Sequence, residues 1–389
     1  MKVLLISSKF YPEYSGSGFR AENTYRRLNK KYNLEFDVIC NSKIFYGNKK
    51  YKHQKVSIYR ISPPFIVSKS KTLKYYLFQI FNIVWQFFYT YLFLLRNHKK
   101  YTLLHTFGDT WTIGFATVYF SLFKKPIIRE LCNDTKYPMY PVQIHSLITK
   151  VFRRSNTLII AISKRLYEVA YVFKPNKIWL RNNPIDERKF NNYNNDKFEL
   201  RKKLTPFNEN DKVLCIIANI IPNKNQLFAL EVLNKLPNEY KIVIAGPLKE
   251  ENKNYLNKVK KYIKENRLSD RVFIKTKFIP DIENYMKLSD VFLFPSHSEG
   301  LGTPVLEAQA CGTPVVSNLI FNITDLMIKK GKGGFVSKLD SEKWSKMIKK
   351  ALEIKATTLK ENAKEVLKKS SSELIDKKYY NYIIKLHEQ

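Results

Sequence analysis

Short apolar runs alternate with amphipathic stretches along the first half of the chain. Because these runs are continuous, they indicate strands that are buried on both faces of a sheet. The predicted strands are Val3–Ser7, Phe36–Cys40, Leu103–His105, Ile127–Arg129 and Thr157–Ile162. Amphipathic patterns such as Arg20–Lys30 and Ser163–Phe173 predict helices between them. Strands that alternate with helices predict a parallel sheet with right-handed crossovers.

The second half repeats this plan with clearer signals. The predicted strands are Val213–Ala218, Lys241–Ala245, Val272–Lys275, Val291–Phe294 and Pro314–Ser317. Helices are expected at Asn225–Lys235 and Asn254–Asn266, and the Asn-rich stretch Asn182–Asn195 predicts a hinge. We therefore expect an α/β chain with two Rossmann-like domains, residues 1–182 and 183–368. A C-terminal helix at 369–389 is expected to pack across the domains.

One segment, Leu73–Leu95, approaches the roughly 20 apolar residues that span a bilayer. Its polar residues recur on one face of a helix, which a spanning helix seldom needs and a surface helix does. These residues are Gln79, Asn82, Gln86 and Thr90. Three interpretations remain open: a helix that faces the domain core, a helix that lies in a membrane interface, and a true span.

Charge and cysteine content narrow the class of protein. The 389 residues carry a formal net charge of +34, which attracts polyanions such as nucleic acid, anionic membrane or phosphorylated substrates. The basic residues are spread over the chain without an RNP-like motif, so we expect no nucleic-acid partner. The scattered cysteines and the short apolar run after Met1 argue against a disulfide framework and a signal peptide. A cytoplasmic protein is expected, with the inner face of the plasma membrane as a candidate location.

The most informative stretch is Pro295–Val316, PSHSEGLGTPVLEAQACGTPVV. It follows a predicted buried strand, so its loop lies where open α/β sheets bind ligands. Gly300 and Gly302 allow close approach of a phosphate, and Thr303 begins a helix whose N–H groups favour negative charge. Glu299 and Glu307 lie eight positions apart, so both can address one extended ligand.

Glu299, seven residues and Glu307 resemble the E-x7-E signature of the retaining glycosyltransferases of the GT-B fold, family 4. Further segments resemble that family in the same order: Asn183–Asp186, Ala218–Asn225, Val243–Pro247 and Tyr285–Asp290. The resemblance covers residues 183–350 well and the N-terminal half loosely. It implies two Rossmann-like domains with parallel sheets that face each other across a cleft.

The resemblance also implies roles for individual residues. Glu299 is expected to contact the donor sugar, Glu307 the nucleotide ribose, and Lys224 the diphosphate. The loop residues Gly300 and Leu301 lead to the Gly302 and Thr303 amides, which are expected to bind the diphosphate from the helix end. Such enzymes need no cofactor and no metal for this step, and the chain contains no Asp-x-Asp motif.

Two departures from the family pattern affect this expectation. The family usually has Arg where this chain has Asn219, so one cation is missing unless Arg181 or Arg271 substitutes. The family often has His in the loop after Ile127–Arg129, where Glu130 is the candidate to bind the sugar instead.

In the N-terminal half, Gly16 and Gly18 resemble the family's Gly-rich loop, which lies beside the diphosphate and the acceptor. An ordinary tight turn is the alternative for these glycines. His105 is a candidate on the acceptor side, and a histidine satisfied at a strand end is the alternative there.

The expected function is transfer of a sugar from a nucleotide-sugar donor to a glycan or lipid-linked acceptor, with retention. The sequence does not identify the sugar or the nucleotide base of the donor. The residues that select the base are expected around Lys277–Pro280. The alternatives are a nucleotide-sugar epimerase on the same fold, an inactive relative that still binds the nucleotide, and a basic nucleic-acid-binding protein.

Overall fold

The chain folds into two compact units. The computed structural model describes residues 1–13, 15–42, 45, 47–65, 72–132, 156–171, 177–191 and 197–388. Unit 1 comprises Met1–Arg181 together with Glu373–Gln389, and unit 2 comprises Asn182–Ser372. The sequence placed the boundary one residue later, and residues 192–195 of the predicted hinge lie outside the described residues.

Unit 1 is built on an eight-stranded sheet with the order β3-β4-β2-β1-β5-β6-β7-β8. Its strands are β1 (Lys2–Ser7), β2 (Glu35–Cys40), β3 (Lys49–His53), β4 (Val56–Arg60), β5 (Leu103–Phe107), β6 (Ile127–Leu131), β7 (Thr157–Ala161) and β8 (Ile178–Leu180). All neighbours pair in parallel except β3 and β4. The predicted buried strands are confirmed, whereas β3, β4 and β8 were not predicted.

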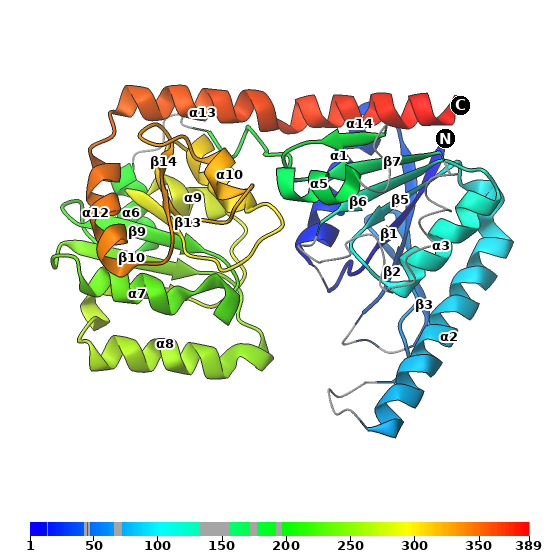
Figure 1. Cartoon of the computed structure of the whole chain (residues 1–389), viewed down its shortest axis with the longest axis horizontal. Coiled ribbons are helices and arrows are strands. Elements are labelled where there is room, and N and C mark those ends of the chain that lie inside the picture. Colours follow the sequence, from blue (N-terminus) through cyan, green and yellow to red (C-terminus); the bar gives the residue numbers. More distant parts are fainter. Residues whose placement is uncertain are drawn as a thin grey trace. The chain divides into compact units, whose positions relative to one another are not determined.

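Helices pack against this sheet (Figure 1). They are α1 (Gly16–Tyr32), α2 (Leu73–Asn97), α3 (Trp111–Leu122), α5 (Lys164–Tyr171) and α14 (Ser372–His387), with a 3-10 turn η1 at His98–Lys100. The expected C-terminal helix is α14, and from Glu373 onward it groups with unit 1. Its buried side chains Ile375, Tyr379 and Ile383 join the core that Val3 and Tyr25 also form.

Unit 2 is a doubly wound sheet of six parallel strands with the order β11-β10-β9-β12-β13-β14. The strands are β9 (Lys212–Ile217), β10 (Tyr240–Ala245), β11 (Val272–Lys275), β12 (Val291–Phe294), β13 (Val315–Asn318) and β14 (Gly334–Ser337). The strand order reverses between β9 and β12. In such sheets the carboxyl ends of the strands at the reversal form the ligand crevice.

The helices of unit 2 follow the strands in alternation. They are α6 (Lys197–Leu204), α7 (Gln226–Asn234), α8 (Lys253–Glu265), α9 (Ile282–Lys287), α10 (Thr303–Ala310), α11 (Thr324–Met327), α12 (Ser341–Leu352) and α13 (Ala356–Ser370). Three 3-10 turns, η2 (Pro222–Lys224), η3 (Glu250–Asn252) and η4 (Ser269–Arg271), complete the unit. The buried Trp344 packs edge-on against Phe228, which joins α12 to α7 on one face of the sheet.

The predicted Leu73–Leu95 helix is confirmed as α2, but its orientation differs from the core-facing interpretation. The polar residues Asn82, Gln86 and Thr90 face the unit, and the apolar residues opposite them are exposed. Within the described residues, Leu73–Lys100 is the one helical segment long and apolar enough to cross a membrane, judged by length and composition only.

Candidate functional site

The candidate site of unit 2 begins with two loops at the point where the strand order reverses. Lys224 lies in η2 after β9, and Glu299 lies in the loop after β12. Their side chains form an ion pair and are only 19% and 15% exposed. The loops are also joined by their backbones, because the His297 N–H donates to the Asn223 carbonyl at 2.9 Å. The strand order thus brings together two predicted site residues that lie 75 positions apart.

The start of α10 forms the next part of the site. Gly302 precedes this helix with φ +86°, and a Cβ atom there would lie 2.9 Å from the Phe294 ring. Glycine is therefore required both by the left-handed backbone and by the close packing. The Thr303 hydroxyl accepts a hydrogen bond from the Asn183 amide at 2.6 Å. The positive end of the α10 dipole lies here, which favours an anion.

Glu307 lies one turn further along α10 and is a perturbed carboxyl. Burial raises its pKa to about 7, and the negative charge of Glu283 on α9 adds to this shift. Glu283 is itself buried, and its Oε2 has no hydrogen-bond partner within the described part of the chain. A perturbed carboxyl at the carboxyl end of a parallel sheet indicates a binding site.

Both arginines named as possible replacements for the missing cation bind other groups of the described structure. Arg271 lies at the amino end of β11, opposite the candidate site, and its guanidinium donates to four backbone carbonyls. Arg181 belongs to unit 1, where it is buried against Glu130. Asn219 is exposed, and its carbonyl accepts a hydrogen bond from Gln226.

The candidate residue Glu130 lies in β6 of unit 1, at the centre of a buried network. Its carboxylate accepts hydrogen bonds from Arg20 Nε at 2.8 Å, from Arg181 Nη2 at 2.7 Å and from the Tyr379 hydroxyl. Burial alone would raise the pKa of Glu130, but Arg181 and Arg20 outweigh it and lower the pKa to about 2. These contacts give Glu130 a structural role, which joins α1, β6 and α14. Of the loop after β6, residues 133–134 lie outside the described residues.

The other unit 1 candidates occupy different environments. His105 is fully buried in β5, and its Nδ1 lies 2.7 Å from the Tyr25 hydroxyl. Burial lowers its pKa to about 3, so the imidazole is neutral. Gly16 and Gly18 form the first turn of α1, where a Cβ on Gly18 would lie 2.1 Å from the Lys9 carbonyl oxygen, whereas Gly16 has open space. The close packing at Gly18 accounts for a glycine there without a ligand.

Comparison with known proteins identifies the second half of the chain. Residues 196–366 match the family model "Glycosyl transferases group 1". These residues form a glycosyl transferases group 1 domain.

Curated relatives align over part of their length. One is the UDP-Gal:alpha-D-GlcNAc-diphosphoundecaprenol alpha-1,3-galactosyltransferase of Escherichia coli, 31% identical over 175 residues, which are 43% of this chain and 42% of that protein. Another is the capsular polysaccharide biosynthesis glycosyltransferase CapH of Staphylococcus aureus, 27% identical over 162 residues, or 40% of this chain and 44% of that protein. The chain thus matches less than half the length of these relatives.

Solved structures confirm the fold class over the whole chain. Anabaena Alr3699/HepE in complex with UDP has a TM-score of 0.77 at 15% identity and covers 99% of this chain and 100% of that one. WaaG, a glycosyltransferase involved in lipopolysaccharide biosynthesis, has a TM-score of 0.63 at 14% identity and covers 96% and 98%. The expected α/β fold of GT-B type, with two parallel-sheet domains, is therefore correct.

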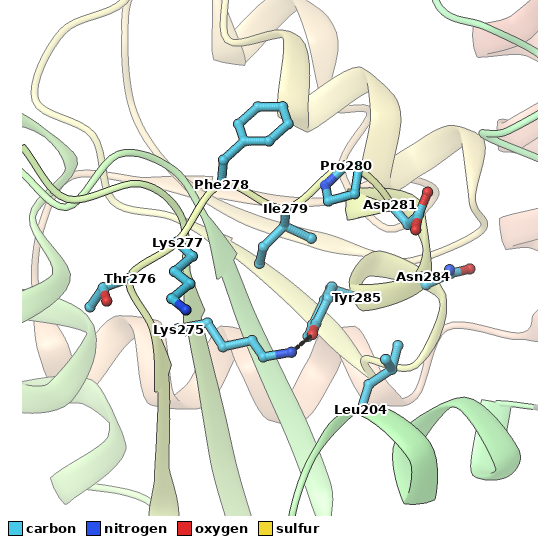
Figure 2. Close-up of a pocket in the computed structure, with 10 residues that line it drawn as sticks. All are labelled: Leu204, Lys275, Thr276, Lys277, Phe278, Ile279, Pro280, Asp281, Asn284 and Tyr285. Carbon is cyan, nitrogen blue, oxygen red and sulfur yellow. Dashed lines mark hydrogen bonds between the residues drawn. The ribbon is translucent and has the colours of Figure 1, made fainter.

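The group 1 domain also has a pocket of about 510 Å³ at the carboxyl end of β11. It includes the predicted base-selecting segment Lys277–Pro280 and residues that the sequence did not single out, such as Leu204 and Asn284. Figure 2 shows Lys275 directed toward Tyr285, and the two side chains are joined by a hydrogen bond of 2.6 Å.

Sequence reasoning also missed Glu283 and the contact of Asn183 with Thr303. An acidic residue at a helix start looks like ordinary pairing with the helix dipole, so no sequence signal distinguished Glu283.

Proposed function

We propose that this protein is a glycosyltransferase of family 4 that moves a hexosyl group from a nucleotide-sugar donor to a glycan or lipid-linked acceptor, with retention. The observation that carries the proposal is the Lys224–Glu299 ion pair at the reversal of strand order in a group 1 domain. This pair lies between the two central strands, where an α/β sheet binds its ligand.

Lys224 and the start of α10 suit the diphosphate of the donor. A nucleoside diphosphate leaves as an anion, and fixed cationic and N–H groups stabilise the charge that develops. Lys224 supplies the cation, and the Gly302 and Thr303 amides supply the donors at the helix start. In this proposal the diphosphate needs no metal ion.

The two carboxylates then have separate roles. When the diphosphate pairs with Lys224, Glu299 loses its partner and becomes free to accept hydrogen bonds from the sugar hydroxyls. Glu307, with its pKa raised to about 7 by burial, gains hydroxyl donors when the ribose binds. The sugar and the nucleotide are thus held by different carboxylates of one loop–helix segment.

The names of the relatives suggest which donor and acceptor to test first. The Escherichia coli relative is named for UDP-Gal and a diphosphoundecaprenol-linked sugar, and the Anabaena structures hold UDP, glucose and UDP-glucose. We therefore propose a UDP-sugar donor and a lipid-linked or glycan acceptor. A cytoplasmic location is also proposed, and it rests on the scattered cysteines of the sequence.

Nucleotide binding tests the donor site. UDP, GDP, ADP and their sugars are titrated by calorimetry and by thermal shift, where ligand at 100 times its dissociation constant adds about 2.7 kcal/mol of stability. Lys224→Ala and Glu307→Ala are expected to weaken the preferred nucleotide about tenfold or more, because each removes a charged partner. The exposed Lys261→Ala and Glu250→Ala serve as matched controls.

Wild-type nucleotide affinity in both site variants would overturn the donor-site assignment. Nucleotide binding without sugar transfer or donor hydrolysis would favour the inactive relative. Interconversion of donor sugars without transfer would favour the epimerase.

A further inference from the structure

Helix α2 is inverted relative to an ordinary surface helix. Its polar stripe is buried, while large apolar side chains opposite that stripe are exposed to solvent. The exposed residues, here called the α2 apolar face, are Leu73, Tyr76, Leu77, Ile80, Phe81, Val84, Phe87, Phe88 and Leu95. Their spacing of mostly three and four residues places them on one side of the helix. An exposed apolar patch of this extent indicates an interaction site.

The buried polar stripe fixes the direction of this face. Asn82 donates to the Phe65 carbonyl at 3.1 Å and accepts from the Phe65 N–H at 3.4 Å. Gln86 accepts a hydrogen bond from the Thr112 hydroxyl at 3.3 Å. Rotation of α2 to bury its apolar face would break these contacts inside the unit. The same contacts make a transmembrane span incompatible with the fold, because one side of the helix is bonded to protein.

Basic residues flank the α2 apolar face along the sequence, and no acidic residue lies in the adjoining sequence. Lys74 lies near one end, while Arg96, Lys99 and Lys100 lie at the other, and all four are exposed. At that second end Phe123, which is half exposed, stacks on His98 at 4.9 Å and precedes the exposed Lys124. Between Asp37 and Asp109 the sequence contains no Asp or Glu. The basic residues Lys69 and Lys71 lie outside the described residues.

We propose that the α2 apolar face inserts into the surface of an anionic lipid bilayer, with α2 lying in the plane of the interface. Apolar side chains enter the boundary between headgroups and acyl chains, and the flanking Lys and Arg side chains lie at headgroup level. An anionic surface fits better than a second copy of this chain, because a second copy would bring like charges together. This inference goes beyond the proposed function and uses no step of sugar transfer.

Vesicle co-sedimentation of the full-length protein tests the proposal. The vesicles are phosphatidylcholine alone, or phosphatidylcholine with about a third phosphatidylglycerol, at low and at high salt. The wild type is expected to bind only the anionic vesicles at low salt, and its binding is expected to fall as salt rises because the Debye length shortens. Recovery of the wild type in the supernatant with anionic vesicles at low salt would overturn the proposal.

Two sets of variants locate the contact. The triple variant Ile80→Ser, Val84→Ser, Phe88→Ser is expected to lose about a hundredfold or more in partition to anionic vesicles, because three apolar side chains no longer enter the lipid. The charge variant Arg96→Gln, Lys99→Gln, Lys100→Gln is expected to lose about tenfold or more and most of the salt dependence. The control variant Tyr171→Ser, Phe198→Ser, Leu326→Ser removes exposed apolar residues elsewhere.

Circular dichroism and urea unfolding check that each variant is folded, and the α2 variants are not expected to lose stability because the substituted residues are exposed. Equal sedimentation of the wild type and the folded triple variant would overturn the assignment of the surface. A concentration-dependent dimer in light scattering, abolished by the triple variant and unaccompanied by vesicle binding, would assign the face to a second copy instead. Because sugar transfer to a soluble acceptor is measured separately, failure here leaves the donor-site proposal intact.

Discussion

The two units use their charged residues in opposite ways. In unit 1, the Glu130 carboxylate is completely buried, and the buried Arg181 and Tyr379 satisfy it together with the partly exposed Arg20. In unit 2, the Lys224–Glu299 pair lies in the loops that follow the two central strands, and both side chains remain partly exposed to solvent. A charge that is compensated on all sides holds a fold together. A pair that water can reach can exchange one partner for a ligand.

Because of this difference, loss of a charged group from each unit is expected to change the free energy of unfolding by a different amount. Removal of one member of a buried ion network leaves the other charges buried without compensation, which costs several kcal/mol. Removal of one member of a partly exposed pair costs far less, because solvent screens the remaining charge. Stability and function are therefore expected to respond to different residues in the two units.

The largest expected effect is on stability. Glu130→Ala should lower the free energy of unfolding by about 3–5 kcal/mol, because Arg181 remains buried without its carboxylate and Arg20 loses the same partner. Urea unfolding at pH 7 measures this loss. Glu299→Ala should cost about 1 kcal/mol or less, and the exposed Glu361→Ala serves as control. Equal losses for the Glu130 and Glu299 variants would remove the distinction between the two units.

Most of the fold follows from the sequence, because buried parallel strands carry continuous apolar runs. Val213–Ala218 and Thr157–Ile162 are examples, and both are confirmed as β9 and β7 within one residue at each end. The edge pair β3 and β4 could not be predicted in this way. Its first strand, Lys-Lys-Tyr-Lys-His, is charged and half exposed, as suits an edge strand, and has no apolar run.

The site residues that could be predicted also belong to local patterns in the sequence, and those that could not depend on long-range contacts. Lys224, Glu299 and Glu307 were predicted because they belong to a local motif with fixed spacing. The role of Glu130 was not predictable, because its two arginines lie 110 and 51 positions away along the chain. The direction of α2 was not predictable either, since the spacing of Asn82 and Gln86 shows that a polar stripe exists but not which side it faces.

The second prediction concerns turnover. Glu299→Gln should lower the rate of sugar transfer by about 100- to 1000-fold, while the affinity for the free nucleoside diphosphate stays within about threefold of the wild type. The physical reason is that this carboxylate is proposed to address the sugar and not the nucleotide. Initial-rate kinetics and calorimetry measure the two quantities. A near-normal transfer rate would assign the sugar contact to another carboxylate.

The last and smallest effect concerns the pH dependence of Glu307. Its folded-state pKa is raised by burial to about 7, above the unfolded value of about 4.3. Between these values the folded state keeps a proton that the unfolded state has lost, so the contribution of Glu307 to stability falls as pH rises. Glu307→Gln removes this charge. Its stability relative to the wild type should rise by about 1–3 kcal/mol between pH 4.5 and pH 8.

Urea unfolding at both pH values, with the exposed Glu250→Gln as control, measures this change. A nucleotide whose ribose donates hydrogen bonds to Glu307 should favour the ionised form. The nucleotide affinity of the wild type is therefore expected to rise as pH increases through about 7. Ionisation of the nucleotide phosphate also changes affinity with pH, and Glu307→Gln keeps this second effect. The rise in the wild type is expected to exceed that in the variant. If the wild type and Glu307→Gln show the same pH profile for nucleotide binding, Glu307 does not contact the ribose, and its carboxyl is part of the helix packing alone.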